Sequence, residues 1–520
     1  MLETPRSLRG MVTSPHHLAS QAGLDILKEG GSAMEVAVAM AACLAVVYPH
    51  MTGIGGDGFW LIAEPGGAVR GIDACGRAAS AADLPLYAGY ETIPTRGPLA
   101  ANTVAGTVSG WQAALTLSGS TLPLDRLLRD AIHHAEQGAP VTRSFTETLA
   151  TKRPELEALP GFLDSYTAEG TRLRQPRLAE TLRRIAAEGC ESFYRGSLAA
   201  DIAADLAAIG SPVVAADLAA HRALEVTPLS VEAFGATLYN MTPPTQGLAS
   251  LLILAVLDRL GDLGPEDGFS HLHALVEATK QAFLIRDKHV GDPDHMTIDP
   301  QALLDDAAAL DAIAARIDPA RALPWPQPPS AGDTTWFGAI DGEGRVVSVI
   351  QSIFFEFGSG MVLPKTGIVW QNRGSSFRLA EGGWNPLRPG AKPFHTLNPA
   401  LARFADGRTM AYGTMGGEGQ PQTQAQIFAR HVIYGASLQQ AVTAPRFLLG
   451  RTWGEQSVTL KLEDRFPAGT VAALRAAGHD VEMLPPFTST MGHAGALIRH
   501  PDGLLEGATD PRSDGQVAAW

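Results

Sequence analysis

The sequence predicts a mixed α and β protein with helices concentrated before Thr334 and strands after it. Helical spacing of apolar residues dominates from about Leu122 to Arg286, whereas short β-branched and aromatic runs separated by glycine turns follow Thr334. The 520 residues are 45% hydrophobic and 18% charged, which is typical of a globular protein with a large core. This length fits about three average domains or one large α/β domain with insertions.

Charge and cysteine content narrow the partners and the compartment. A net charge of −14 argues against nucleic acid or an anionic membrane surface as the main partner, but it allows a small anionic substrate. Cys43, Cys75 and Cys190 are too few for a disulfide framework or a cysteine-based zinc site, which favours a reducing compartment. The first ten residues lack the apolar core of a signal peptide, so we expect a cytoplasmic protein.

The N-terminal segment predicts two helices and a glycine turn. The first helix covers His16 to Leu27 and the second, capped by Ser32, covers Ala33 to Val47; its apolar run is too short to span a bilayer. Residues 53–58 form a literal G-x-G-x-x-G, but they follow a helix and open a strand (59–63), the reverse of a dinucleotide site. We therefore interpret them as a tight turn. A nucleotide-binding oxidoreductase is the alternative that rests on this motif.

The following elements are a second strand and a series of helices. The strand covers Ala68 to Ile72 and leaves Arg77 just beyond its end. Helices are expected at about 178–188, 198–209, 248–260 and 272–286. His271 and His273 with Asp292 and Asp294 suggest a metal cluster, but alternate residues of a helix do not share a face. We predict no metal and no other cofactor.

A proline-rich segment leads into a β-hairpin. Residues from Leu310 to Gly332 carry five prolines and predict an extended linker. Residues 333–352 then form two β-rich arms around an Asp-Gly-Glu-Gly turn. If the chain cuts itself before Thr334, this threonine gains an α-amine that can act as the base for its own hydroxyl. The alternative is that Thr334 and Thr335 simply open a strand.

A second glycine pair lies between a predicted strand (410–414) and a predicted helix (423–434). Gly416 and Gly417 leave backbone N–H groups that can face an anion or a developing oxyanion. An ordinary turn between strand and helix is the alternative. A helix at 468–477 and a strand at 494–499 complete the expected elements.

Several segments together resemble the γ-glutamyltransferase family of N-terminal-nucleophile hydrolases. The segments that carry the resemblance are Gly53–Phe59, Glu277–Asp287, Asp292-Pro293, Gly332–Thr335, Phe357–Gly360, Met415–Gly417 and Asp510–Arg512. The resemblance implies a four-layer αββα sandwich and cleavage between Asp333 and Thr334. It gives a large subunit of residues 1–333 and a small subunit of residues 334–520, with a homodimer of this heterodimer among the expected assemblies.

The resemblance also implies roles for individual residues. Thr334 would be the nucleophile, with Thr335 and Ser352 hydrogen-bonded around it. The N–H groups of Gly416 and Gly417 would form the oxyanion hole. Arg77 would grip the substrate carboxylate with its bidentate fork.

The substrate pocket departs from the family pattern. Members that use glutathione carry an acid that holds the substrate ammonium, where this chain has Ser376, after Ser375. Arg373 stands at a position that is usually neutral, and His395 and Thr396 replace a serine pair. Losing an anion and gaining a cation disfavours a glutamyl ammonium group. We therefore expect an acyl group that bears a carboxylate and no ammonium.

Oxamate amidohydrolases of purine-ureide breakdown fit this pattern best among the relatives. We expect hydrolysis of oxamate to oxalate and ammonia, with Arg77 and Arg373 on the carboxylate. The alternatives are a γ-glutamyltransferase or glutathione hydrolase and a cephalosporin or glutaryl acylase. An uncleaved, non-catalytic binding protein is the alternative from another class.

Overall fold

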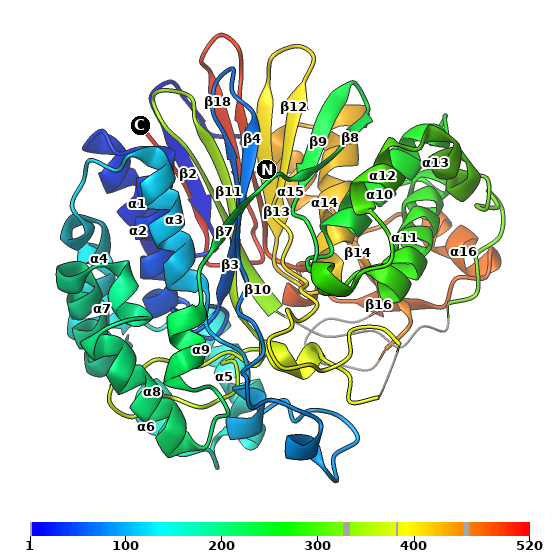
Figure 1. Cartoon of the computed structure of the whole chain (residues 1–520). Helices are drawn as coiled ribbons and strands as arrows, with labels where there is room; N and C mark the ends of the chain where they lie inside the picture. The colour runs from blue at the N-terminus through cyan, green and yellow to red at the C-terminus, as the bar shows by residue number, and fades with distance from the viewer. Residues whose placement is uncertain (1–2, 326–332, 381–382, 451–456) are drawn as a thin grey trace.

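The computed structural model contains two facing seven-stranded sheets between layers of helices, and it describes residues 3–325, 333–380, 383–450 and 457–520 (Figure 1). This is the expected αββα sandwich. The first sheet has, in spatial order, the strands β19 (Gln516–Ala519), β2 (Met11–Ser14), β10 (Asp333–Ile340), β11 (Val346–Phe354), β3 (Asp57–Ala63), β4 (Val69–Ala74) and β7 (Leu224–Val226). The second has β1 (Arg6–Ser7), β18 (Leu505–Thr509), β17 (Ala494–Arg499), β13 (Thr409–Thr414), β12 (Ala400–Phe404), β9 (Ala236–Asn240) and β8 (Leu229–Ala233).

Each sheet carries its own layer of helices (Figure 1). The first sheet is covered by α1 (His17–Lys28), α2 (Ala33–Val47) and α3 (Thr107–Ser118), with α4 (Leu124–Gln137), α7 (Pro176–Glu188) and α8 (Ser197–Ile209) outside them. The second sheet is covered by α10 (Gly247–Arg259), α14 (Gly419–Phe428) and α15 (Leu438–Thr443), with α11 (Phe269–His289), α13 (Ala307–Ala314) and α16 (Ala468–Ala476) outside them. None of the helices among the described residues combines the length and apolar character that crossing a bilayer requires.

Strand periodicity explains why the two sheets share a core. Along β3, Phe59 and Leu61 pack between the sheets, whereas Trp60 and Ile62 pack against the helices. Successive side chains of a strand point to opposite faces, so a strand covered on both sides is apolar at every position. This is why the sequence of β3 is a continuous apolar run.

The helix signals of the sequence are confirmed. Ser32 accepts a hydrogen bond from the N–H of Glu35, and the Glu35 carboxylate accepts one from the N–H of Ser32. This capping box fixes the start of α2 at the predicted residue, since it satisfies two backbone donors that a helix leaves free. All fifteen residues of α2 are buried.

The two regional predictions have different outcomes. The segment 122–286 is mostly helical, as expected, and it also contains β7, β8 and β9, which pair at sheet edges. The prediction of an extended linker is wrong at its start. The linker expected from Leu310 contains the end of α13, because alanine and leucine at helical spacing outweigh the later prolines. Leu323 is also tied down: its N–H donates to Glu277 and its carbonyl accepts from Lys280 of α11. Residues 326–332 of the expected linker lie outside the described residues.

Candidate active site

Thr334 lies at the start of β10, in the first sheet, and its side chain is completely buried. The register of β10 against β11 shifts between Asp333, opposite Phe354, and Thr335, opposite Gln351. A bulge of this kind re-aims a strand end and is frequent next to active sites. Thr335 Oγ1 donates to the carbonyl of Gln351 at 2.8 Å, which fixes the strand immediately after Thr334.

Trp336 holds β10 in place from between the sheets. Its indole lies over two glycines of the second sheet: an added Cβ at Gly413 would lie 2.2 Å from Trp336 Cδ1, and one at Gly495 would lie 2.5 Å from Cζ3. The indole Nε1 donates to Ser348 Oγ at 2.9 Å. The position of Thr334, two residues earlier, therefore depends on small residues of the opposite sheet.

Gly416 and Gly417 form the turn between β13 and α14. Their φ angles are 115° and 52°, in a region that residues with a Cβ rarely adopt. Among the described residues both carbonyls accept hydrogen bonds, but neither N–H donates one. Two free N–H groups in one turn suit the expected oxyanion hole.

Gln246 joins this turn to the His395-Thr396 segment. Its Nε2 donates to the carbonyl of Gly417 at 2.8 Å and to that of Thr396 at 2.7 Å. Its Oε1 accepts from Nη1 of the buried Arg286 in α11 at 2.9 Å. The structure thus brings together two candidate segments that are 20 residues apart in the sequence.

Arg373 is a buried cation with unused donors. Its side chain is 1% exposed, and its Cζ lies 3.7 Å from the ring centroid of Phe354, the residue paired with Asp333. Nη1 donates to Thr396 Oγ1 at 3.3 Å, whereas Nε and Nη2 have no hydrogen-bond partner in the described part of the chain. Burial lowers the pKa of Arg373 to about 9, and Asp57 opposes this shift, so the guanidinium is charged at neutral pH. A buried guanidinium with free N–H groups is suited to binding a carboxylate.

His395 is paired with Asp57, which lies opposite Ser352 in the register of β3 and β11. His395 Nε2 lies 2.9 Å from Asp57 Oδ2, and both side chains are fully buried. Burial, together with the charge of Arg373, holds the pKa of His395 well below its usual range, so the imidazole is neutral. Burial also raises the pKa of Asp57 to about 7, against the hydrogen bonds that it accepts and the charge of Arg373.

The serine candidates bond to the backbone. Ser352 Oγ accepts from the N–H of Phe354 at 2.9 Å. Ser375 Oγ donates to the carbonyl of Asn372 at 2.8 Å, and Ser376 Oγ donates to that of Phe394 at 3.2 Å. Ser375 and Ser376 belong to the same short helical turn as Arg373 (η5, Arg373–Ser376), so they shape the segment that presents the guanidinium.

Arg77 contacts other groups than Arg373 does. Its guanidinium pairs with Asp294 Oδ2 at 3.3 Å and donates to the carbonyl of Gly390 at 2.9 Å, with 44% of the side chain exposed. It lines a cavity of about 490 Å³ together with Lys392 and Arg222. Binding of a substrate carboxylate by Arg77 therefore remains a prediction. Of the two arginines, Arg373 is the one that contacts the candidate residue Thr396.

The histidines considered for a metal site have other partners. His273 Nδ1 lies 2.9 Å from His479 Nε2, and its Nε2 lies 2.8 Å from the carbonyl of Asp318. Glu277 completes this possible ligand set, but it already binds the ammonium of Lys280 at 2.7 Å. A second set combines Asp57, Cys75 and His395, close to the charge of Arg373. Neighbouring cations oppose a metal ion at both places.

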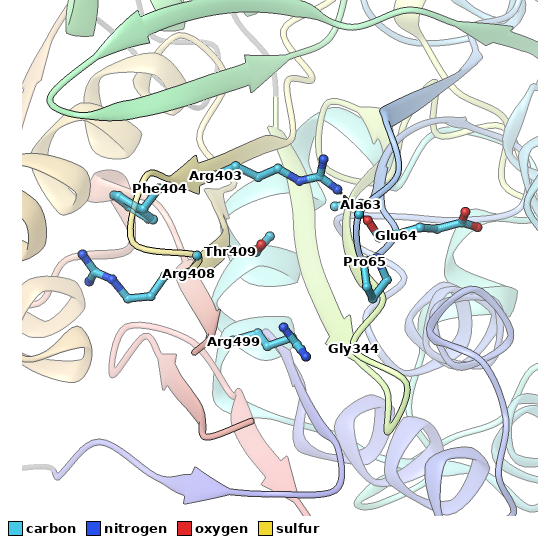
Figure 2. A pocket seen from close by; sticks show the side chains of 11 residues that line it. Ala63, Glu64, Pro65, Gly344, Arg403, Phe404, Arg408, Thr409 and Arg499 are labelled. Carbon is cyan, nitrogen blue, oxygen red and sulfur yellow. Dashed lines mark hydrogen bonds between the residues drawn. The ribbon is translucent and has the colours of Figure 1, made fainter. Parts of the chain in front are cut away.

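A further cavity lies at the other end of β10. It measures about 290 Å³ and is lined by Gly344 of the β10–β11 turn and by Arg403, Arg408 and Arg499 (Figure 2). The length of β10 separates it from Thr334. It therefore belongs to a different part of the molecule from the residues that surround the nucleophile.

Sequence reasoning missed three residues of the site. Asp57 was assigned only to a tight turn, although a lone acid among glycines before a buried strand is a usable signal of a buried polar contact. Gln246, after two prolines, and Phe354, in a buried strand, carry no local signal of their contacts. Their partners Thr396, Gly417 and Arg373 are distant in the sequence.

Comparisons with known proteins show the family and the fold. The family model described as gamma-glutamyltranspeptidase matches residues 19–520. The chain is 54% identical to the oxamate amidohydrolase proenzyme of Klebsiella pneumoniae subsp. pneumoniae, over 99% of both chains. It is 41% identical to the glutathione hydrolase-like YwrD proenzyme of Bacillus subtilis, over 97% of both. The crystal structure of cephalosporin acylase from Bacillus halodurans superposes with a TM-score of 0.92 at 32% identity, covering 100% of this chain and 97% of that one. The chain belongs to the gamma-glutamyltranspeptidase family of self-processing hydrolases.

Proposed function

We propose that this protein hydrolyses oxamate to oxalate and ammonia, with Thr334 as the nucleophile. The observation that carries the proposal is Arg373, a buried guanidinium with two N–H groups free among the described residues, held beside Thr396. Such a group binds a carboxylate and repels an ammonium. Similarity to a relative named oxamate amidohydrolase supports the same substrate.

Maturation would expose the nucleophile. The Thr334 hydroxyl attacks the carbonyl carbon of Asp333, and the peptide nitrogen of Thr334 leaves as an amine while an ester forms. Water then hydrolyses the ester and frees the threonine. The products are subunits of residues 1–333 and 334–520. The relatives named as proenzymes support this processing.

Turnover would use the same oxygen. Thr334 Oγ1 attacks the amide carbon of oxamate, and the new α-amine accepts the hydroxyl proton. The N–H groups of Gly416 and Gly417 stabilise the oxyanion, each by an amount on the order of 3 kcal/mol in comparable enzymes. The C–N bond breaks and the nitrogen leaves with the proton as ammonia. Water then hydrolyses the oxalyl ester and restores the hydroxyl.

Substitution of single arginines tests which of them binds the substrate carboxylate. Arg373→Met should lower kcat/KM for ammonia release from oxamate by about 10²–10³, because the carboxylate loses a buried charged partner. Complete processing and an unchanged melting temperature are required controls, because removing one buried charge destabilises a fold when its partner, here Asp57, stays behind. Arg77→Met tests the other candidate arginine. Arg408→Met, in the cavity at the other end of β10, is the matched control, with an expected change of less than about threefold. A larger loss in Arg77→Met than in Arg373→Met would assign the carboxylate to Arg77.

A substrate panel separates the alternatives. Wild-type protein should release ammonia from oxamate and leave γ-glutamyl-p-nitroanilide and glutaryl amides nearly untouched. The similarity to a cephalosporin acylase makes glutaryl amides the strongest competing substrates. Turnover of γ-glutamyl-p-nitroanilide without ammonia from oxamate would overturn the proposal.

Mass spectrometry tests self-cleavage. Purified wild-type protein should give two fragments, the smaller starting at Thr334, and Thr334→Ala should give one intact chain. Cleavage of the alanine variant at the same bond would contradict the mechanism. An intact, inactive wild-type chain would instead identify a non-catalytic binding protein.

The cellular setting is part of the same proposal. We place the protein in the cytoplasm and in purine nitrogen breakdown, with a homodimer of the processed heterodimer as a candidate assembly. The three cysteines are buried and free, as a reducing compartment would keep them. Fractionation of cells grown on a purine as the nitrogen source tests the location.

A further inference from the structure

Besides Nε and Nη2 of Arg373, a third buried atom of this region has no hydrogen-bond partner among the described residues. This atom is His395 Nδ1. His395 is adjacent in sequence to Thr396, which accepts from Arg373, and the charge of Arg373 acts on the imidazole. A buried acceptor without a partner costs free energy comparable to a lost hydrogen bond, so its retention calls for an explanation.

Asp57 determines which nitrogen of His395 carries the proton. Its Oδ1 accepts from the N–H groups of Gly76 at 2.9 Å and Gly106 at 3.0 Å, and from Gln371 Nε2 at 3.1 Å. Its Oδ2 faces His395 Nε2. Three donors on one oxygen favour the carboxylate form, which can only accept from Nε2–H. The proton of the neutral imidazole is therefore on Nε2, and Nδ1 keeps a lone pair.

We propose that His395 Nδ1 accepts a hydrogen bond from the primary amide NH₂ of the substrate while Arg373 binds the adjacent carboxylate. This inference rests on the proposed function and refines it. Two donors on Arg373 and one acceptor on His395 complement a molecule in which a carboxylate and a carboxamide are directly bonded. Asp57 is then a positioning residue, because it acts through the tautomer of His395.

This arrangement gives selectivity for amides. An N–H of the amide donates to the lone pair of His395 Nδ1. The oxygen of an ester has no hydrogen to donate, so its lone pair would face that of Nδ1. A site built to accept a substrate N–H discriminates strongly against analogues that lack it. Monoethyl oxalate is the matched analogue, since it has the same carboxylate and an ester in place of the amide.

Asp57→Asn tests the tautomer. The asparagine Oδ1 keeps its three donors, but its Nδ2 donates to His395 Nε2, which moves the imidazole proton to Nδ1 and turns the acceptor into a donor. The ratio of kcat/KM for oxamate to kcat/KM for monoethyl oxalate should fall by about tenfold or more relative to wild type. Equal melting temperature and complete processing into two fragments serve as controls for folding.

Two variants of His395 test the role of Nδ1 if Asp57→Asn does not fold. The asparagine amide occupies the place of Nδ1, whereas the glutamine amide reaches that of Nε2. His395→Asn should therefore retain more of the amide preference than His395→Gln. An unchanged amide-to-ester ratio in Asp57→Asn, or equal ratios in the two His395 variants, would overturn the inference. Wild-type protein without activity on oxamate would instead overturn the proposed function itself.

Discussion

At the scale of single residues, the site combines a charged guanidinium and a neutral imidazole, and each has hydrogen-bonding atoms without partners among the described residues. Arg373 lacks partners for two of its donors, and His395 lacks a donor for Nδ1. Both are at most 1% exposed, so they lie away from bulk solvent. A carboxylate next to an amide would satisfy all three atoms together, which is the physical basis of the proposed specificity.

The loss of activity at acidic pH should reflect protonation of Asp57. Burial raises its pKa to about 7, so below this pH its carboxyl carries a proton, Oδ2 donates to His395 Nε2, and Nδ1 loses its lone pair. The freed α-amine of Thr334, with a usual pKa of about 7.7–8, is also protonated in this range. Activity therefore falls with decreasing pH for two reasons.

Log kcat/KM for oxamate should consequently approach a slope of about 2 between roughly pH 5 and 6 in wild type and about 1 in Asp57→Asn. The titratable groups that interact with Asp57 include Arg373, His395, Cys75 and Tyr194, and none of these is expected to titrate in that window. A slope near 1 in both proteins would assign the whole limb to the α-amine.

At the scale of elements, the placement of the nucleophile depends on how β10 fits against the second sheet. Trp336 fills the space left by Gly413 of β13 and Gly495 of β17. Interiors are packed as densely as organic crystals, so a displaced indole must move the strand that carries it. Thr334 lies two residues from Trp336, within the register shift between Asp333 and Thr335.

Gly413→Ala should therefore disturb both stability and maturation. The added methyl group would lie 2.2 Å from Trp336 Cδ1, and overpacking of this kind typically destabilises by about 1–3 kcal/mol. We expect a lower midpoint of urea unfolding and slower appearance of the two fragments. Gly469→Ala in α16 is the control, because nothing lies within 4 Å of its added Cβ. Normal processing in Gly413→Ala would show that the cleavage step tolerates movement of β10.

At the scale of the whole molecule, the two expected subunits share both sheets. In the first sheet β2 lies between β19 and β10, and β11 pairs with β3. In the second sheet β1 pairs with β18, and β12 pairs with β9. Each of these pairs joins a strand before residue 333 to a strand from residue 333 onward. Cleavage before Thr334 would cut the chain without removing any of them.

The processed fragments should accordingly stay together and unfold together. Native mass spectrometry should give the summed mass of the two fragments, and urea unfolding should show one transition by both fluorescence and circular dichroism. The fragments should separate only in denaturant. Dissociation under native conditions would mean that the pairs between these strands contribute little to holding the subunits together.

Local patterns determined much of this protein from the sequence alone. The start of α2 follows from Ser32 and Glu35, and β3 follows from its continuous apolar run, since capping and strand burial depend on neighbours in the chain. The Gly416-Gly417 turn was likewise identified from its glycines between a strand and a helix. The family motifs predicted the sandwich, which the structure confirms.

Only the tertiary structure decided how the site is assembled. Asp57 and His395 are 338 residues apart, and no periodicity relates them. Arg77 is exposed and paired with Asp294, whereas Arg373 is buried and bonded to Thr396. This difference comes from burial, which the residue type alone does not determine. Backbone geometry is encoded over a few residues, whereas the charge state and partners of a side chain are set by whatever the fold packs around it.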